Sequence, residues 1–350
     1  MVNILFISAI ALVIAVLFQQ SFKSLPKEKW QIIGAIPKKK IDDNKWLGMN
    51  LTYYGFFNAN AYGFATALIF VLLGSLEIPL VIIFTIVITI FAFCMPASKI
   101  VARIVEKKPS TFSVGGAFFV GIIIIPWVVW LIRETLGIQM GVDVQILTVL
   151  AAVSIAYAFG EGIGRLACIS FGCCYGKPLS DVSSIFQKLF EKKNFIFRGK
   201  TKKIAYAHGY DNQKVMPIQA VTAIIFTASG LLGLCFFLNR NFIAAFFITV
   251  LMTQSWRFLS EFYRADYRGE RKISAYQIMG ICSILYAVFI AVFFPTAPSQ
   301  FPNILKGLQV FWHPEVILFI EALWIATFLF TGRSEVTSAT MSFHVVKEKV

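Results

Sequence analysis

Long uncharged stretches dominate the pattern of hydrophobic and polar residues along the chain. A helix needs about 20 apolar residues to cross a bilayer, and nine stretches approach or reach that length. The hydrocarbon interior holds no water to bind exposed peptide groups, so these stretches must form helices. A closed barrel would show weaker, alternating segments. The predicted spans are residues 2–18, 54–76, 78–95, 115–132, 144–162, 217–238, 241–258, 274–294 and 315–332.

Composition favours an all-α polytopic membrane protein with a single helical bundle. Of the 350 residues, 58% are hydrophobic and 14% are charged, and the 36 phenylalanines suit helices that face lipid. These values exclude an ordinary soluble domain. Residues 2–18 lack a basic leading segment and a small-residue cleavage site, so we expect them to form an uncleaved first helix.

Basic residues gather in the segments between spans, on one side of the predicted bundle. Of the 32 Lys and Arg side chains, 29 fall in the segments 19–53, 96–114, 163–216, 257–273 and 333–350. The positive-inside rule places these segments, and with them the C-terminus, in the cytoplasm. We expect anionic lipid headgroups, and not nucleic acid, to be the partner of the net charge of +14.

The densest chemistry lies at residues 160–178, which read GEGIGRLACISFGCCYGKP after an apolar run. An arginine at the centre of a membrane helix costs roughly 3 kcal/mol, so a retained one usually has an anionic partner or a water-filled cavity. A phospholipid phosphate is such a partner for Arg165. We expect the neighbouring glycines to take positive φ and let this side chain and free N–H groups converge on a phosphoryl group.

Five separated motifs follow one another between residues 52 and 294. They are Thr-Tyr-Tyr-Gly at 52–55, Thr-Phe-Ser-Val-Gly-Gly at 111–116, Gly-Arg-Leu-Ala-Cys at 164–168 running on to Gly176, Met-Pro-Ile-Gln at 216–219, and Glu-Phe-Tyr-Arg at 261–264 with Ser-Ala-Tyr-Gln at 274–277. In their order and their placement against the spans they resemble the motifs of the prolipoprotein diacylglyceryl transferase family.

The resemblance implies a seven-helix core with one extra helix at each end. The implied division is 1–50 (extra N-terminal helix and basic loop), 51–300 (membrane core with a basic interfacial segment at 179–216) and 301–350 (extra C-terminal helix and tail). In the interfacial segment, Ile185, Phe186, Leu189 and Phe190 predict a short amphipathic helix, and a plain basic tether is the alternative.

The chain also departs from the family pattern. Val114 and Met216 stand where the family has histidines, Cys168 replaces an asparagine and Ala167 a glycine. Cys173 replaces an acidic residue, and Thr222 replaces a glutamate. The family presents its signature outside the cytoplasm, whereas the charge count places this one inside.

The resemblance implies transfer of a diacylglyceryl group from phosphatidylglycerol to a lipoprotein cysteine thiol in a bacterial plasma (inner) membrane. Two alternatives stay open: a phospholipid donor with a different acceptor at the cytoplasmic face, and a non-catalytic protein that binds or transports lipid. The predicted catalytic residues are Arg165, Arg264, Tyr54 and Cys168. The predicted substrate-binding residues are Gly115, Gly116, Gly164, Gly176, Gln219, Glu261 and Gln277.

Arg165 and Arg264 are expected to meet in one crevice and to bind the phosphate, because guanidinium groups stay charged and bind oxygens in pairs. The alternative is structural pairing with Glu161 or Glu261. Tyr54 could orient a substrate oxygen or simply pack at the interface. None of His208, His313 and His344 falls in a motif, so the sequence identifies no general base.

Cysteine usage indicates a reducing or membrane-buried setting, since the six cysteines contain no C-x-x-C pair. Cys168, Cys173 and Cys174 could be packing residues, or one could be a nucleophile activated by Arg165. Their spacing lacks the usual pairing and a nearby histidine, so we predict no metal, and we predict no cofactor.

Overall fold

The computed structural model describes residues 1–107, 113–267, 273–294 and 300–350. Within these ranges, nine helices are long and apolar enough to cross a membrane, which confirms the predicted spans, including separate helices on either side of residues 77–79. They are α1 (Val2–Ser24), α2 (Tyr53–Gly74), α3 (Leu80–Glu106), α4 (Val114–Ile132), α6 (Ile146–Phe171), α9 (Ile218–Leu238), α10 (Phe242–Ser260), α11 (Ala275–Phe293) and α13 (Pro314–Thr331).

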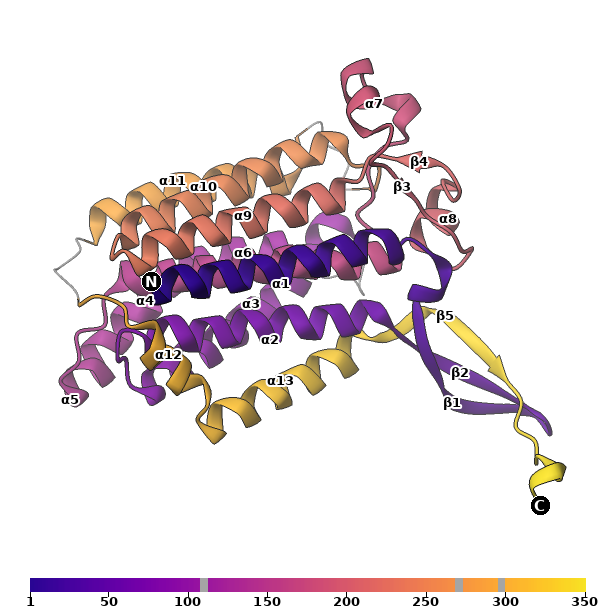
Figure 1. The fold of residues 1–350 in the computed structure, drawn as a ribbon, viewed down its shortest axis with the longest axis horizontal. Coiled ribbons are helices and arrows are strands. Elements are labelled where there is room, and N and C mark those ends of the chain that lie inside the picture. The colour runs from indigo at the N-terminus through magenta and orange to yellow at the C-terminus, as the bar shows by residue number, and fades with distance from the viewer. Residues whose placement is uncertain (108–112, 268–272, 295–299) are drawn as a thin grey trace.

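The central element of the bundle is α6, which packs against α2, α9 and α10 (Figure 1). Small residues along it let its neighbours approach closely. A Cβ atom on Gly162 would lie 2.6 Å from the hydroxyl of Thr227 on α9, and one on Gly160 would lie 3.1 Å from Ala65 on α2. The helix is therefore buried along most of its length, including the polar residues Thr148, Ser154, Glu161 and Ser170.

The end of α6 differs from the prediction. The helix continues past residue 162 to Phe171, so Arg165 and Cys168 are helical residues and not loop residues. It ends at Gly172 (φ +71°), where the N–H of Cys173 donates to the carbonyl of Cys168. The expected positive φ is found at Gly172 but not at Gly162 and Gly164, which lie inside the close-packed helix.

The long basic segment is only partly helical. It holds α7 (Ser184–Phe190), which confirms the short amphipathic helix in part, then β3 (Phe195–Ile196), α8 (Lys203–His208) and β4 (Lys214–Val215). The strands β3 and β4 pair antiparallel. At the opposite end of the bundle lie the short helices α5 (Ile138–Met140) and α12 (Ile304–Phe311).

A three-stranded antiparallel sheet projects from the end of the bundle where α6 finishes (Figure 1). It consists of β1 (Ile32–Asp42), β2 (Lys45–Thr52) and β5 (Arg333–Met341), in the order β1-β2-β5. The hydrophobic pattern did not reveal these strands, and their segments were predicted to be a basic loop and a tail. The charged residues in and beside β1 concealed its extended pattern, and the pairing of β2 with β5 joins segments nearly 300 residues apart.

Candidate active site

A cavity of about 240 Å³ lies among α2, α3, α4, α6 and α10. Apolar side chains line most of it, including Ile69, Ile122 and Leu150. Tyr54 and Asn58 from α2 and Glu161 and Arg165 from α6 add polar groups. Because α2 begins and α6 ends at the face that carries the sheet, these polar groups lie toward that face. The arrangement matches a molecule with an apolar body and a polar end.

Glu161 is buried and binds two arginines at once. The guanidinium of Arg165, one turn along α6, forms an ion pair with Oε1 of Glu161. Nη2 of Arg257, from α10, lies 3.4 Å from the same oxygen and donates to the hydroxyl of Tyr157 at 2.7 Å. Two guanidinium groups therefore share one carboxylate, and the cluster carries a net positive charge.

Both arginines retain unused donors. Among the described residues, neither Nε of Arg165 nor Nε of Arg257 has a hydrogen-bond partner, although both atoms are buried. A buried guanidinium with an unused N–H is costly, and an oxyanion would satisfy the donor and the charge together. Together the two side chains can bind an anion beside the cavity.

Arg257, the second arginine at Glu161, was not among the predicted site residues. It lies near the end of a membrane span, so the cost argument that singled out Arg165 could have found it. Gly115, one of the predicted binding residues, lies directly against it, since a Cβ atom at this position would be 2.7 Å from Nη1 of Arg257. Gly115 thus makes room for an arginine.

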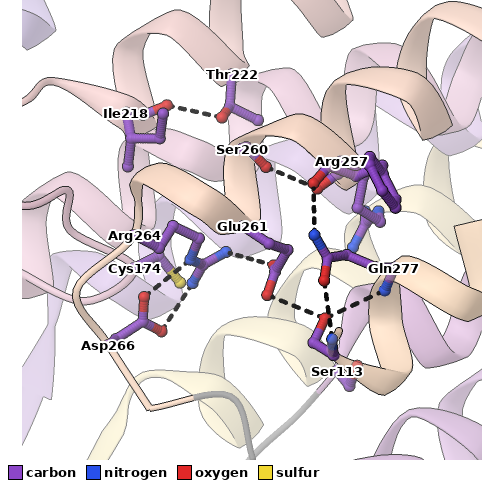
Figure 2. A network of polar contacts seen from close by, with 12 residues as sticks. Ser113, Cys174, Ile218, Thr222, Arg257, Ser260, Glu261, Arg264, Asp266 and Gln277 are labelled. Atoms are coloured by element: carbon purple, nitrogen blue, oxygen red, sulfur yellow. Dashed lines mark hydrogen bonds and ion pairs between the residues drawn. The ribbon is translucent and has the colours of Figure 1, made fainter. Parts of the chain in front are cut away.

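Arg264 does not line the cavity with Arg165, contrary to expectation. Its guanidinium forms two hydrogen bonds of 2.8 Å to Asp266, and it lies 3.7 Å from Glu261 (Figure 2). Burial raises the pKa of Asp266 to about 6, although the charge of Arg264 opposes that rise. At neutral pH the carboxylates therefore occupy this arginine, and its role as a phosphate ligand has no support in the geometry.

The three cysteines of the signature lie together where α6 ends. The sulfurs of Cys168, Cys173 and Cys174 all lie within 4.8 Å of one another, and Cys168 also lines the cavity. Cys174 has a positive φ of 55°. Hydrogen bonds with the other two thiols, reinforced by the charges of Arg264 and Arg165, lower the pKa of Cys174 well below its usual range against the effect of burial.

The remaining predicted residues take different places. Gly164 and Tyr54 line the cavity. Gln219 donates to the backbone carbonyl of Cys173 at 2.9 Å, so it supports the cysteine cluster. Glu261 contacts Arg264 and accepts a 3.5 Å hydrogen bond from Ser274.

Three other predicted binding residues have structural roles at a helix start or in close backbone packing. Gln277 completes a capping box with Ser274 at the start of α11. Gly116 lets α4 approach Val101 of α3. Gly176 lies against the backbone of Met216 and bridges to Arg264.

No histidine lines the cavity in the part of the chain that the structure describes. His208 lies on α8, where its Nδ1 hydrogen-bonds to the hydroxyl of Tyr175. Val114, which stands where the transferase motif has a histidine, does line the cavity. Residues 111–112 of that motif lie outside the described residues.

Comparison with known families shows which family the chain belongs to. The sequence model of the prolipoprotein diacylglyceryl transferase family matches residues 46–293, from β2 to the end of α11. The chain belongs to the prolipoprotein diacylglyceryl transferase family. No curated protein sequence gives a significant match to it.

Membership makes this diacylglyceryl transferase homologue a polytopic membrane enzyme of lipoprotein biosynthesis, in accord with its nine apolar helices. The family implies a lipid donor and a lipoprotein precursor as substrates. The match includes Glu161, Arg165 and Arg257, whereas α1, β1, α13 and β5 lie outside it.

Proposed function

We propose that the protein transfers a diacylglyceryl group from phosphatidylglycerol to the cysteine thiol of a lipoprotein precursor in a bacterial inner membrane. The observation that carries the proposal is the pair of arginines around Glu161 beside an apolar cavity. The acyl chains would occupy the cavity, and the phosphate would lie between Arg165 and Arg257.

The charge of the cluster suits a phosphodiester. Two guanidinium groups and one carboxylate leave one positive charge, which a single lipid phosphate would neutralise. The unused Nε donors of both arginines would bind phosphoryl oxygens. Tyr54 and Cys168, which line the same cavity, would lie near the reacting end of the lipid.

The reaction is a displacement at the glyceryl carbon. The acceptor sulfur forms a bond to this carbon, the bond from the carbon to the phosphate oxygen breaks, and its electron pair leaves with glycerol phosphate. Negative charge therefore grows on the departing phosphate, and the two guanidinium groups would stabilise it.

A different acceptor at the cytoplasmic face is the second candidate. The basic segments, where the structure describes them, join the bundle at the end that carries the cysteine cluster, and the positive-inside rule places that end in the cytoplasm. In that case the donor site would be the same and the thiol acceptor would change.

The test is an assay of purified protein with phosphatidylglycerol labelled in its acyl chains and a peptide containing a lipoprotein acceptor cysteine. We expect label on the peptide. We also expect Arg165→Ala and Arg257→Gln each to lower kcat/KM by about 100-fold or more, since each removes a charged donor from the departing group.

Arg133→Gln is the matched control, because this arginine pairs with Asp143 at the other end of the bundle. It should transfer label like the wild type. Release of glycerol phosphate without labelled peptide would support the second candidate. Transfer at the wild-type rate in both Arg165→Ala and Arg257→Gln would contradict the arginine site.

A further inference from the structure

The cysteine cluster has the dimensions of a metal site. The sulfurs of Cys168 and Cys174 are 3.8 Å apart, and the sulfur of Cys173 joins them within 4.8 Å. In a tetrahedral zinc site with Zn–S bonds of about 2.3 Å, two sulfurs lie about 3.8 Å apart. The existing separation of Cys168 and Cys174 therefore fits, and small side-chain rotations would bring in the third sulfur.

The backbone holds this geometry in place. The C-terminal turn of α6 carries Cys168, and the turn that follows Gly172 brings Cys173 and Cys174 back toward it. Gln219 on α9 holds the carbonyl of Cys173. Because the chain around the sulfurs is fixed from two helices, the three ligands need little ordering when a cation binds.

The surrounding charge suits a metal thiolate. Three thiolates around a divalent cation carry one negative charge, which needs compensation in a buried place. Nη1 of Arg165 lies 4.0 Å from the sulfur of Cys168, and Arg264 lies near Cys174 (Figure 2). Each of these arginines also pairs with a carboxylate, so they would offset the charge of the site in part.

We propose that Cys168, Cys173 and Cys174 bind a thiophilic divalent cation of the zinc class, with one coordination position left open. Among the described residues, no His, Asp or Glu joins the three sulfurs, so a zinc ion here would have a vacant fourth position. On binding, each thiol that is still protonated releases its proton to solvent. The proposal replaces the prediction of no metal, which rested on the spacing of the cysteines and on the lack of a nearby histidine.

The open position gives the site a place in the reaction, an extension that rests on the proposed function. Cys168 lines both the cation site and the lipid cavity, so a ligand in the cavity can reach the metal. An acceptor thiol bound there would lose its proton to water and become a thiolate. The metal would thus activate the acceptor thiol. Among the described residues, no histidine lines the cavity to act as the base for that step.

The site is tested on full-length protein purified in detergent with its thiols reduced, stripped with a chelator, incubated with Zn²⁺ and desalted. We expect one equivalent of zinc to remain bound, and Co²⁺ in its place to give sulfur-to-cobalt charge-transfer absorption. Cys168→Ser, Cys173→Ser and Cys174→Ser should each reduce zinc retention to background and weaken that absorption. Equal retention by the triple variant, or no retention by the wild type, overturns the site.

Two sets of controls separate this result from folding and from the proposed function. Cys282→Ser and Cys235→Ser alter cysteines outside the cluster and should retain zinc fully. Arg257→Gln should lose transfer yet still retain zinc. If the wild type transfers lipid at full rate after chelation, the catalytic part of the proposal is overturned while the transferase assignment stands.

The acceptor role has its own readout. A peptide with the acceptor cysteine should shift the Co²⁺ spectrum, and the same peptide with serine should leave it unchanged. Identical spectra with both peptides would overturn the role of the open position.

Discussion

Glu161 connects the charged side chains beside the cavity, and its burial explains why they lie together. A buried carboxylate without partners would be protonated or would destabilise the fold, so it needs nearby cations. One arginine would neutralise it, yet two bind it here. The second positive charge is the feature that a purely structural ion pair does not require, and it is the reason for assigning an anion to this place.

Gly115 offers a test of the arginine geometry that leaves every charge in place. In Gly115→Ala, the new methyl group would lie 2.7 Å from Nη1 of Arg257 and 3.3 Å from the ring of Tyr276, so the guanidinium must move. We expect kcat/KM for lipid transfer to fall by about 100-fold, as misplacement of a binding group by about 1 Å can do. The thermal midpoint of the variant should stay close to that of the wild type.

Gly34→Ala is the control for this prediction, because no atom lies within 4 Å of the added methyl group. It should keep full activity. Full activity in Gly115→Ala as well would show that the position of Arg257 does not matter to the reaction.

Individual site residues were predictable where one residue stood out against its surroundings. Arg165, Tyr54, Cys168 and Gly164 all line the cavity, and the sequence pointed to each through a motif or a charge at the edge of a span. Arg264 was placed wrongly because its strongest partner, Asp266, was not considered, whereas the pairing with Glu261 that the sequence had left open is present. The gathering of three sulfurs depends on the turn after Gly172, which residue spacing does not show.

At the scale of elements, Lys202 ties the end of α6 to the end of α1. It is fully buried, and its Nζ donates to the carbonyl of Ser170 at 2.6 Å and to that of Leu25 at 3.1 Å. These carbonyls lie in the last turn of α6 and just after α1, where intrahelical partners are lacking. The lysine thereby holds the loop that precedes α8 against the end of the site helix.

Burial lowers the pKa of Lys202 to about 7, which gives a prediction for stability against pH. In the unfolded chain this lysine keeps its proton up to about pH 10.4, so between pH 7 and 10 the unfolded state binds more protons than the folded state. Stability from this group therefore rises with pH in that window. The thermal midpoint of the wild type relative to Lys202→Met should increase from pH 7 to pH 10, by the equivalent of about 1 kcal/mol per pH unit.

The neighbouring Lys203 provides the control, since its pKa is raised, not lowered: burial opposes the rise, and the charges of Cys173 and Cys174 favour it. Lys203→Met should show no such slope between pH 7 and 10. A constant difference between the wild type and Lys202→Met across the range would refute the account of Lys202.

Hydrophobic patterning predicted the existence of every span, because length and the absence of charge are enough to identify a membrane helix. It misplaced the end of α6, where glycines that usually interrupt helices are accommodated by packing against α2 and α9. It also gave no sign of the sheet. The pairing of β2 with β5 depends on bringing both ends of the chain to one face of the bundle.

At the scale of the whole molecule, the polar end of the cavity, the cysteine cluster and the sheet lie at one end of the bundle. The basic segments that the structure describes join the bundle at the same end (Figure 1). Positive segments stay preferentially in the cytoplasm. We therefore expect this end, with the C-terminus, to face the cytoplasm.

A compartment-sensitive reporter fused after Val350 tests this orientation. The reporter should behave as a cytoplasmic protein, and a second reporter in the loop between α9 and α10 should behave as an external one. The reverse pattern would show that the fold overrides the charge bias, and it would remove the support for an acceptor on the cytoplasmic side.

The most direct test of the central claim is an experimental structure of the protein with phosphatidylglycerol bound. We predict acyl density in the cavity between α2, α4 and α6, and a phosphate within hydrogen-bonding distance of the guanidinium groups of both Arg165 and Arg257. A lipid bound with its phosphate remote from both arginines, or held by Arg264 instead, would contradict the account.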